Sequence, residues 1–114
     1  MAECIFCRIV AGEIPARVVR QDEQTLAFRD INPQAPTHVL VIPKRHIPAV
    51  NDLKPADAEL VGRLFLAAKE VAQQEGIASS GYRLVMNNGP DAGQSVDHIH
   101  LHVLGGRHLG WPPG

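Results

Sequence analysis

Residues 98–104 read His-Ile-His-Leu-His-Val-Leu, and the first six alternate strictly between polar and apolar side chains. Successive side chains of a β-strand point to opposite faces of the sheet, so a period of two predicts a strand. We expect His98, His100 and His102 on one face, with the intervening apolar side chains anchored in a core on the other. The chain must then build a sheet with two different faces, and one of them carries a row of imidazoles.

The remaining patterns predict an α+β fold with a mostly antiparallel sheet, one long helix and a short N-terminal helix. A continuous apolar run at 39–42 is typical of a strand buried on both faces. An apolar stripe with helical spacing follows Pro55 and ends at Gly76. The other expected elements are a helix at 4–11, strands at 17–20, 25–29 and 82–87, loops at 30–36 and 88–95, and an irregular tail at 105–114.

Composition and charge narrow the class of protein. A chain of 114 residues with 45% apolar and 20% charged residues is ordinary for a globular protein, and we expect one domain spanning 1–114. The net charge of −1 provides no general attraction to nucleic acid or anionic membranes, so any anion site must be local.

No apolar stretch approaches the roughly 18–20 residues that span a bilayer. We therefore expect a cytoplasmic protein without a signal peptide.

Three histidines in one row could bind a metal, bind an anion or carry out covalent chemistry. Zinc binds imidazole nitrogen at about 2.0–2.1 Å, and two histidines at i and i+2 can converge on one ion. The backbones of the outer pair, however, lie roughly 13 Å apart in a strand. A single zinc ion shared by all three histidines would need a severe bend, which disfavours that interpretation.

The segment at 87–95, which precedes the triad, is rich in groups that bind anions. Gly89 and Gly93 permit close approach of backbone N–H groups, and the Gln and Ser that follow add side-chain donors. Such donors can hold the oxygens of a phosphoryl group while a neutral imidazole attacks phosphorus. His100 has a histidine on each side and is the best placed nucleophile. The alternative is a polar loop beside histidines on an exposed sheet face.

Cys4 and Cys7 form a Cys-x-x-Cys pair near the start of the chain. A reducing cytosol disfavours a structural disulfide, and a redox pair normally follows a strand, for which there is no room before residue 4. A two-residue spacer suits a tetrahedral thiolate pair, so half of a metal site is one interpretation. A short amphipathic turn with small buried residues is the other.

These motifs resemble those of the histidine-triad (HIT) proteins, whose signature is His-φ-His-φ-His-φ-φ with φ apolar. The resemblance covers essentially the whole chain and is closest to the Hint branch. Other shared motifs are D-I-x-P-Q-A-P-T-H at 30–38, I-P-K-x-H-I at 42–47, G-Q-S-V at 93–96 and W-P-P-G at 111–114. Several independent motifs in the same order carry the resemblance.

The resemblance implies a homodimer whose two sheets join into one. It also implies hydrolysis of purine nucleoside 5′-phosphoramidates, such as adenosine 5′-phosphoramidate, through a covalent nucleotidyl-histidine intermediate. A dinucleoside polyphosphate hydrolase or a nucleotidyltransferase of the same superfamily is the closest alternative, because it uses the same intermediate. A non-catalytic nucleotide- or zinc-binding module is the alternative from another class, and the intact triad argues against it.

The resemblance also implies roles for individual residues. His100 would be the nucleophile, oriented by the backbone carbonyl of His98, and His102 would contact the phosphate. His38 would act as a proton relay behind the triad, and Ser95 would lie near the leaving group. The implied nucleotide-binding residues are Phe28 and Ile31 at the base, Asp30 at the ribose, and Asn87, Gly93, Gln94, Ser95, Val96, His100 and His102 around the phosphate.

The N-terminal pair departs from the animal Hint pattern, which lacks Cys-x-x-Cys. It is similar to bacterial relatives that begin Cys-Ile-Phe-Cys, several of which hold a structural zinc. The corresponding ligands in this chain are Cys4, Cys7, His46 and His98. Two thiolates and two imidazoles complete a tetrahedron with no open position, so the implied zinc is structural and is not required for catalysis.

Overall fold

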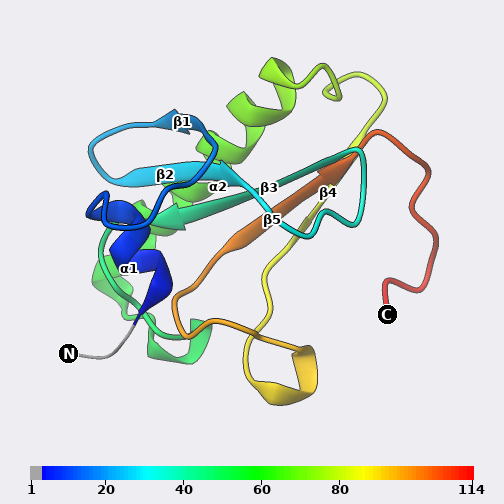
Figure 1. The fold of residues 1–114 in the computed structure, drawn as a ribbon. Helices are drawn as coiled ribbons and strands as arrows, with labels where there is room; N and C mark the ends of the chain where they lie inside the picture. Colours follow the sequence, from blue (N-terminus) through cyan, green and yellow to red (C-terminus); the bar gives the residue numbers. More distant parts are fainter. Residues whose placement is uncertain (1–3) are drawn as a thin grey trace.

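In the computed structural model, which describes residues 4–114, a five-stranded sheet lies between a long helix and a short one (Figure 1). Neighbouring strands are antiparallel and follow the order β1-β2-β3-β5-β4. The elements are α1 (Ile5–Val10), β1 (Val18–Gln21), β2 (Thr25–Arg29), β3 (Thr37–Pro43), α2 (Ala58–Gln74), β4 (Tyr82–Val85) and β5 (Leu101–Gly105). The predicted α+β fold and its order of elements are confirmed.

The central strand β3 is buried along its whole length, as the apolar run predicts. Val39 and Val41 belong to the core beneath α2. Leu40 and Ile42 point the other way and pack with residues of α1. The sheet therefore separates two apolar clusters, one under each helix.

The structure confirms which face of the sheet the apolar residues of 98–104 occupy, but only part of this segment forms a strand. Ile99, Leu101 and Val103 are fully buried in the core beneath α2. Ladder pairing begins only at Leu101 and continues to Gly105, so the strand starts three residues later than predicted. Continuing the register would place Ile99 opposite Pro43, which has no N–H to donate. The Ile99 N–H instead donates to the carbonyl of Ile47, at 2.8 Å.

Helix α2 forms as the stripe predicts, with a 3₁₀ turn at Pro55–Asp57 before it. The Lys54 N–H donates to Oδ2 of Asp57 at 2.8 Å, and the Asp57 N–H donates to the backbone carbonyl of Lys54 at 2.8 Å, because a lysine side chain has no acceptor to offer it. Gly76 has a φ of +74° and ends the helix, and the next N–H bonds back to the carbonyl of Ala72. The buried stripe is Leu60, Leu64, Ala67, Ala68, Val71 and Ala72.

The two ends of the chain contribute no further helix or strand among the described residues. Residues 1–3 lie outside the described part, so the structure does not address the expected absence of a signal peptide. The irregular tail spans 106–114 and begins one residue later than predicted, because Gly105 still pairs with Thr37 and Tyr82 in the sheet. Within the part of the chain that is described, neither helix combines the length and the apolar character needed to cross a membrane.

Candidate functional site

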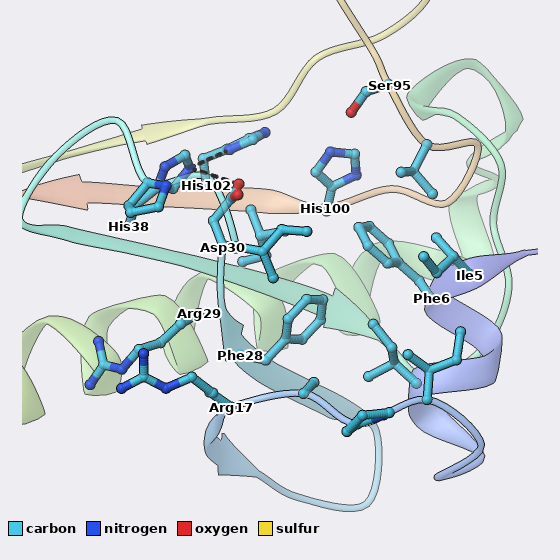
Figure 2. Close-up of a pocket in the computed structure, with 18 of the residues that line it drawn as sticks. Ile5, Phe6, Arg17, Phe28, Arg29, Asp30, His38, Ser95, His100 and His102 are labelled. Carbon is cyan, nitrogen blue, oxygen red and sulfur yellow. Dashed lines mark hydrogen bonds and ion pairs between the residues drawn. The ribbon is translucent and has the colours of Figure 1, made fainter.

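The face of the sheet that carries α1 is hollowed by a cavity of about 1020 Å³ (Figure 2). One end of the cavity is apolar and is lined by α1 and β2, including Ile5, Phe6 and Phe28. The other end is polar and holds the imidazoles of His100 and His102. The cavity therefore offers an apolar surface and a cluster of nitrogen groups within one space.

His100 is buried at the polar end and has one nitrogen committed to the backbone. Its Nδ1 lies 2.7 Å from the carbonyl oxygen of His98. A carbonyl only accepts, so Nδ1 carries the proton and the lone pair of the neutral ring is on Nε2. The Phe6 ring meets His100 edge to face, with ring centroids 5.1 Å apart. These contacts orient the His100 ring and leave Nε2 as its nucleophilic nitrogen.

His102 is oriented by a chain of hydrogen bonds that starts at the backbone of Gln34. The Gln34 N–H donates to Nδ1 of His38 at 3.1 Å, which places the His38 proton on Nε2. That Nε2 lies 2.9 Å from Nδ1 of His102, which must therefore accept. The proton of neutral His102 is then on its own Nε2. This atom is buried and has no partner among the described residues, so it offers an unused N–H donor.

Burial keeps both imidazoles of this pair neutral. Desolvation, followed by repulsion from His100 and His38, lowers the pKa of His102 to about 4. Desolvation also lowers the pKa of His38, although the carboxylate of Asp30, whose Oδ2 lies 3.4 Å from Nε2 of His38, opposes that shift. An anion bound beside His102 would favour a proton on the pair, because opposite charge stabilises an imidazolium.

The same trio of Asp30, His38 and His102 has ligand atoms close enough to hold a metal ion. The two facing nitrogens, however, are 2.9 Å apart. Imidazole nitrogens on one tetrahedral zinc, with bonds of about 2.05 Å, would lie about 3.3 Å apart. The shorter distance and the backbone donor on His38 fit a hydrogen-bond chain.

The structure brings most of the predicted nucleotide-binding residues to one cavity. The residues that line it are Phe28, Asp30, Ile31, Ser95, Val96, His100 and His102, whereas Asn87, Gly93 and Gln94 are not part of its lining. Sequence reasoning assigned no role at this cavity to the apolar side chains of α1. The available signal in the sequence is the pair of apolar residues Ile5 and Ile9 on a very short helix. In the structure Ile5 is about half exposed.

The glycine-rich loop uses its donors differently from the sequence-based interpretation. The Gly93 N–H donates to the carbonyl of Pro90 at 3.0 Å, and the Gly89 N–H donates to the Gln94 side chain at 2.8 Å. Gln94 itself donates to two backbone carbonyls, one of them that of Pro48 at 2.7 Å. These groups hold the loop together, and the positive φ angles of both glycines, +85° and +82°, shape its turn. Ser95 is the side chain of this loop that reaches the cavity (Figure 2).

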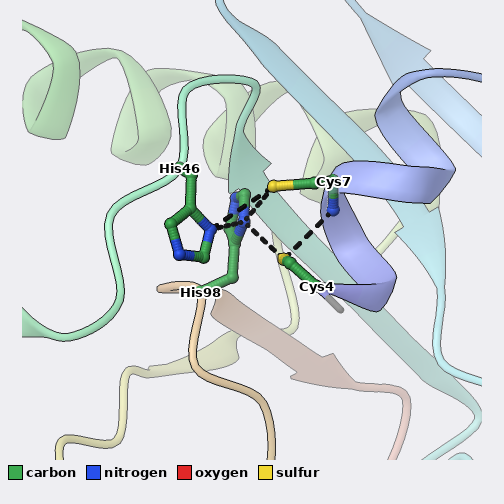
Figure 3. A group of neighbouring side chains, drawn as sticks. All are labelled: Cys4, Cys7, His46 and His98. Carbon is green, nitrogen blue, oxygen red and sulfur yellow. Dashed lines mark hydrogen bonds between the residues drawn. The ribbon is translucent and has the colours of Figure 1, made fainter. Parts of the chain in front are cut away.

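A second cluster joins the start of the chain to the start of the histidine segment (Figure 3). Cys4 caps α1, its sulfur accepting the Cys7 N–H at 3.2 Å. Its Sγ also lies 3.3 Å from Nδ1 of His98, and Sγ of Cys7 lies 3.3 Å from Nδ1 of His46. The remaining close distances are 3.6 Å from Cys7 to His98 and 3.2 Å between the two Nδ1 atoms.

These distances fit a tetrahedral metal ion. Bonds of about 2.3 Å to sulfur and about 2.0 Å to nitrogen would place the ligand atoms about 3.3–3.8 Å apart. Nε2 of His98 lies 2.8 Å from the carbonyl of Pro43, which fixes its lone pair on Nδ1, toward the sulfurs. Burial and the neighbouring Cys4 raise the pKa of the Cys7 thiol to about 11, so a cation is needed to hold thiolates here. The four side chains could hold a metal ion.

His98 connects the two groups of residues. Its ring faces the cysteines, while its carbonyl oxygen accepts the proton of Nδ1 of His100. Phe6 also contacts both rings, with centroids 5.8 Å from His98 and 5.1 Å from His100. The predicted row of histidines is therefore divided between two adjacent sites.

Comparison with known proteins identifies the chain's relatives. A family model of the HIT domain matches residues 11–109. The purine nucleoside phosphoramidase of Escherichia coli strain K12 is 53% identical, over 95% of this chain and 91% of that protein. An uncharacterized HIT-like protein of Synechocystis sp. is 54% identical over the full length of both chains.

Solved structures agree with this result. A HIT family hydrolase from Legionella pneumophila superposes with a TM-score of 0.97 at 56% identity, covering 98% of this chain and 100% of that one. A histidine triad protein from Clostridium difficile superposes with a TM-score of 0.93 at 39% identity, covering 96% of each chain.

We predict that His102 stays neutral down to about pH 4, below the ordinary histidine value of 6.5. The unfolded chain takes up a proton at higher pH than the folded chain does. The free energy of unfolding should therefore fall as the pH drops from 6.5 toward 4 and level off above 6.5. An NMR titration of histidine-labelled protein, with His102 assigned through a His102→Asn variant, measures the midpoint. A midpoint at 6 or above would contradict the buried, neutral ring.

Proposed function

The chain belongs to the HIT domain family, and from that membership we propose that it hydrolyses purine nucleoside 5′-phosphoramidates through a covalent nucleotidyl-histidine intermediate. The observation that carries the proposal is the pairing of two nitrogens in one cavity. Nε2 of His100 holds a lone pair, and Nε2 of His102 holds a buried proton without a partner. Attack on a phosphoryl group requires a nucleophile and, beside it, a hydrogen-bond donor that binds the phosphoryl oxygens. The name of the 53% identical relative from Escherichia coli supports the choice of substrate class.

The cavity suggests how a nucleotide would bind. We place the purine against the apolar wall, between Phe28, Ile31 and the side chains of α1. Asp30 would accept hydrogen bonds from the ribose hydroxyls, because its carboxylate retains acceptor capacity beyond the Asn32 N–H that it binds at 2.8 Å. The phosphoryl oxygens would accept hydrogen bonds from Nε2 of His102 and from the hydroxyl of Ser95. Asn87, Gly93, Gln94 and Val96 would shape the loop around them.

Two displacement steps follow from this placement. In the first, Nε2 of His100 forms a bond to phosphorus as the bond from phosphorus to the amine nitrogen breaks. An amine leaves only when it is protonated. We assign that proton to the His38–His102 pair, which takes it up when the phosphoryl anion binds beside His102, with Ser95 beside the leaving group. In the second step water attacks phosphorus, the bond to His100 breaks and the proton of the water returns to the pair. The products are the amine and the nucleoside monophosphate.

We also propose that the ion held by Cys4, Cys7, His46 and His98 is zinc. Two sulfurs and two imidazole nitrogens are a donor set that zinc prefers, and four protein ligands leave no open position. The metal would hold α1 against the sheet and, through His98, support the carbonyl that orients His100. Its contribution would be structural, because every step above uses side chains alone.

We further propose that residues 1–114 form one HIT domain and that two copies associate. Strand β4 is an edge of the sheet, so its outer backbone groups are available for a second strand. On α2, Phe65 and Leu66 are exposed by 47% and 60% of their surface. Burial of these side chains against a second copy would remove an unfavourable exposure.

Replacement of His100 by alanine or glycine should reduce hydrolysis of adenosine 5′-phosphoramidate by at least about 1,000-fold, because both nitrogens of His102 and of His38 are engaged or protonated and only Nε2 of His100 among these three rings offers a free lone pair. The measurement is steady-state release of nucleoside monophosphate, with diadenosine polyphosphates as competing substrates. His108→Ala, an exposed histidine of the tail, is the matched control and should keep full activity. Near wild-type turnover by either His100 variant would refute the nucleophile, and preference for the polyphosphates would refute the substrate class.

Protein purified without added metal should contain about one equivalent of zinc per chain by elemental analysis. Cys7→Ser should lose it and unfold at a lower temperature, because a buried ligand set without its ion leaves polar groups unsatisfied. Ala11→Ser, an exposed substitution at the end of α1, should retain both the metal and the stability. Less than a tenth of an equivalent in the wild-type protein would count against the site.

A further inference from the structure

The tail that follows β5 folds back onto the loop that precedes β3. Gly106 has a φ of +92°, and a Cβ at this position would come within 2.8 Å of Pro36. The next residue, Arg107, donates from both Nε and Nη2 to the carbonyl oxygen of Gln34, at 3.2 and 2.9 Å. Gly106 allows the tail to approach Pro36 closely, and the guanidinium of Arg107 holds the tail to the loop through its bonds to Gln34.

Gln34 is also the residue that sets the proton position on His38. Its carbonyl is held by Arg107, and its N–H donates to Nδ1 of His38 at 3.1 Å. This hydrogen bond keeps the His38 proton on Nε2, where it faces Nδ1 of His102 at 2.9 Å. A continuous series of contacts thus runs from an exposed arginine of the tail to the buried N–H that faces the phosphoryl site.

We propose that Arg107 is a positioning residue, which holds the loop at Gln34 so that His102 presents an N–H and not a lone pair to the substrate. The proposal rests on the proposed function, since it assumes that this N–H binds a phosphoryl oxygen. Arg107 itself touches no reacting atom.

The chemistry of imidazole explains why the loop position matters. If the Gln34 N–H moved away, Nδ1 of His38 would be free to carry the proton and Nε2 would accept. His102 would then donate from Nδ1, and its Nε2 would direct a lone pair at the phosphoryl oxygen. The Asp30 carboxylate favours a proton on Nε2 of His38 only weakly, because its Oδ2 lies 3.4 Å from that nitrogen, beyond a regular hydrogen bond. Two guanidinium donors on one carbonyl oppose such a movement.

A second arginine provides a matched control. Arg83 of β4 donates to the carbonyls of Leu109 and Gly110, at 3.4 and 2.8 Å. It holds the same tail, but neither of these bonds involves the loop at 30–36, His38 or His102. Loss of Arg83 therefore loosens the tail without removing the bond to Gln34.

The test compares Arg107→Ala, Arg107→Lys and Arg83→Ala in protein labelled with ¹⁵N-histidine. Long-range ¹H–¹⁵N spectra of the free protein should show the Nε2–H tautomer of both His38 and His102 in the wild type. Arg107→Ala should lower the Nε2–H population of His102 and reduce kcat/KM about tenfold, as expected for loss of one oriented hydrogen bond. Arg107→Lys should recover part of both, since an ammonium can still donate to the carbonyl.

Arg83→Ala should leave the tautomers and kcat/KM as in the wild type. Unchanged tautomers in Arg107→Ala would overturn the proposal whatever its activity, and so would an equal change in Arg83→Ala. The spectra need no substrate. If the wild type fails to hydrolyse phosphoramidates, the proposed function fails, while the tautomers still decide the role of Arg107.

Discussion

The site depends on the buried alternate residues of the segment at 98–103. Ile99, Leu101 and Val103 are withdrawn from water beneath α2, each contributing about 1.5–3 kcal/mol of burial free energy. A slip of one residue would turn all three away from α2 and place the imidazoles in the apolar core beneath that helix. The core therefore fixes the face on which the histidines stand, and the chemistry follows from that face.

The end of strand pairing at Pro43 then separates the histidines. Because the ladder stops before His100, the preceding backbone is free to direct the His98 ring to the cysteines and its carbonyl to His100. His102 remains within the strand and bonds to His38 on the neighbouring β3. One segment can thus contribute the His98 ring to the cluster with the cysteines and the rings of His100 and His102 to the cavity.

Local sequence patterns predict much of the fold, and their physical basis explains which features they do not predict. Period-two alternation and the continuous run at 39–42 report which faces are buried, so the sheet and the helix could be predicted from the sequence. The start of β5 could not, because it depends on Pro43 of another strand and on a bond from Ile99 to Ile47. The sequence of the glycine-rich loop predicts free donors, but the Gly89 N–H donates to Gln94, the Gly93 N–H donates to Pro90, and the Gln94 side chain donates to distant carbonyls such as that of Pro48. Contacts between residues far apart in the chain leave no local signal.

The proposed mechanism requires His100 to carry the nucleotidyl group between its two steps. A single-turnover reaction with adenosine 5′-phosphoramidate, quenched in alkali to preserve phosphorus–nitrogen bonds and mapped by peptide mass spectrometry, tests it directly. We expect one transient adenylyl group, located on His100, that forms and decays at rates matching turnover. Turnover without any adduct, or an adduct on His98, His102 or Ser95, would contradict it.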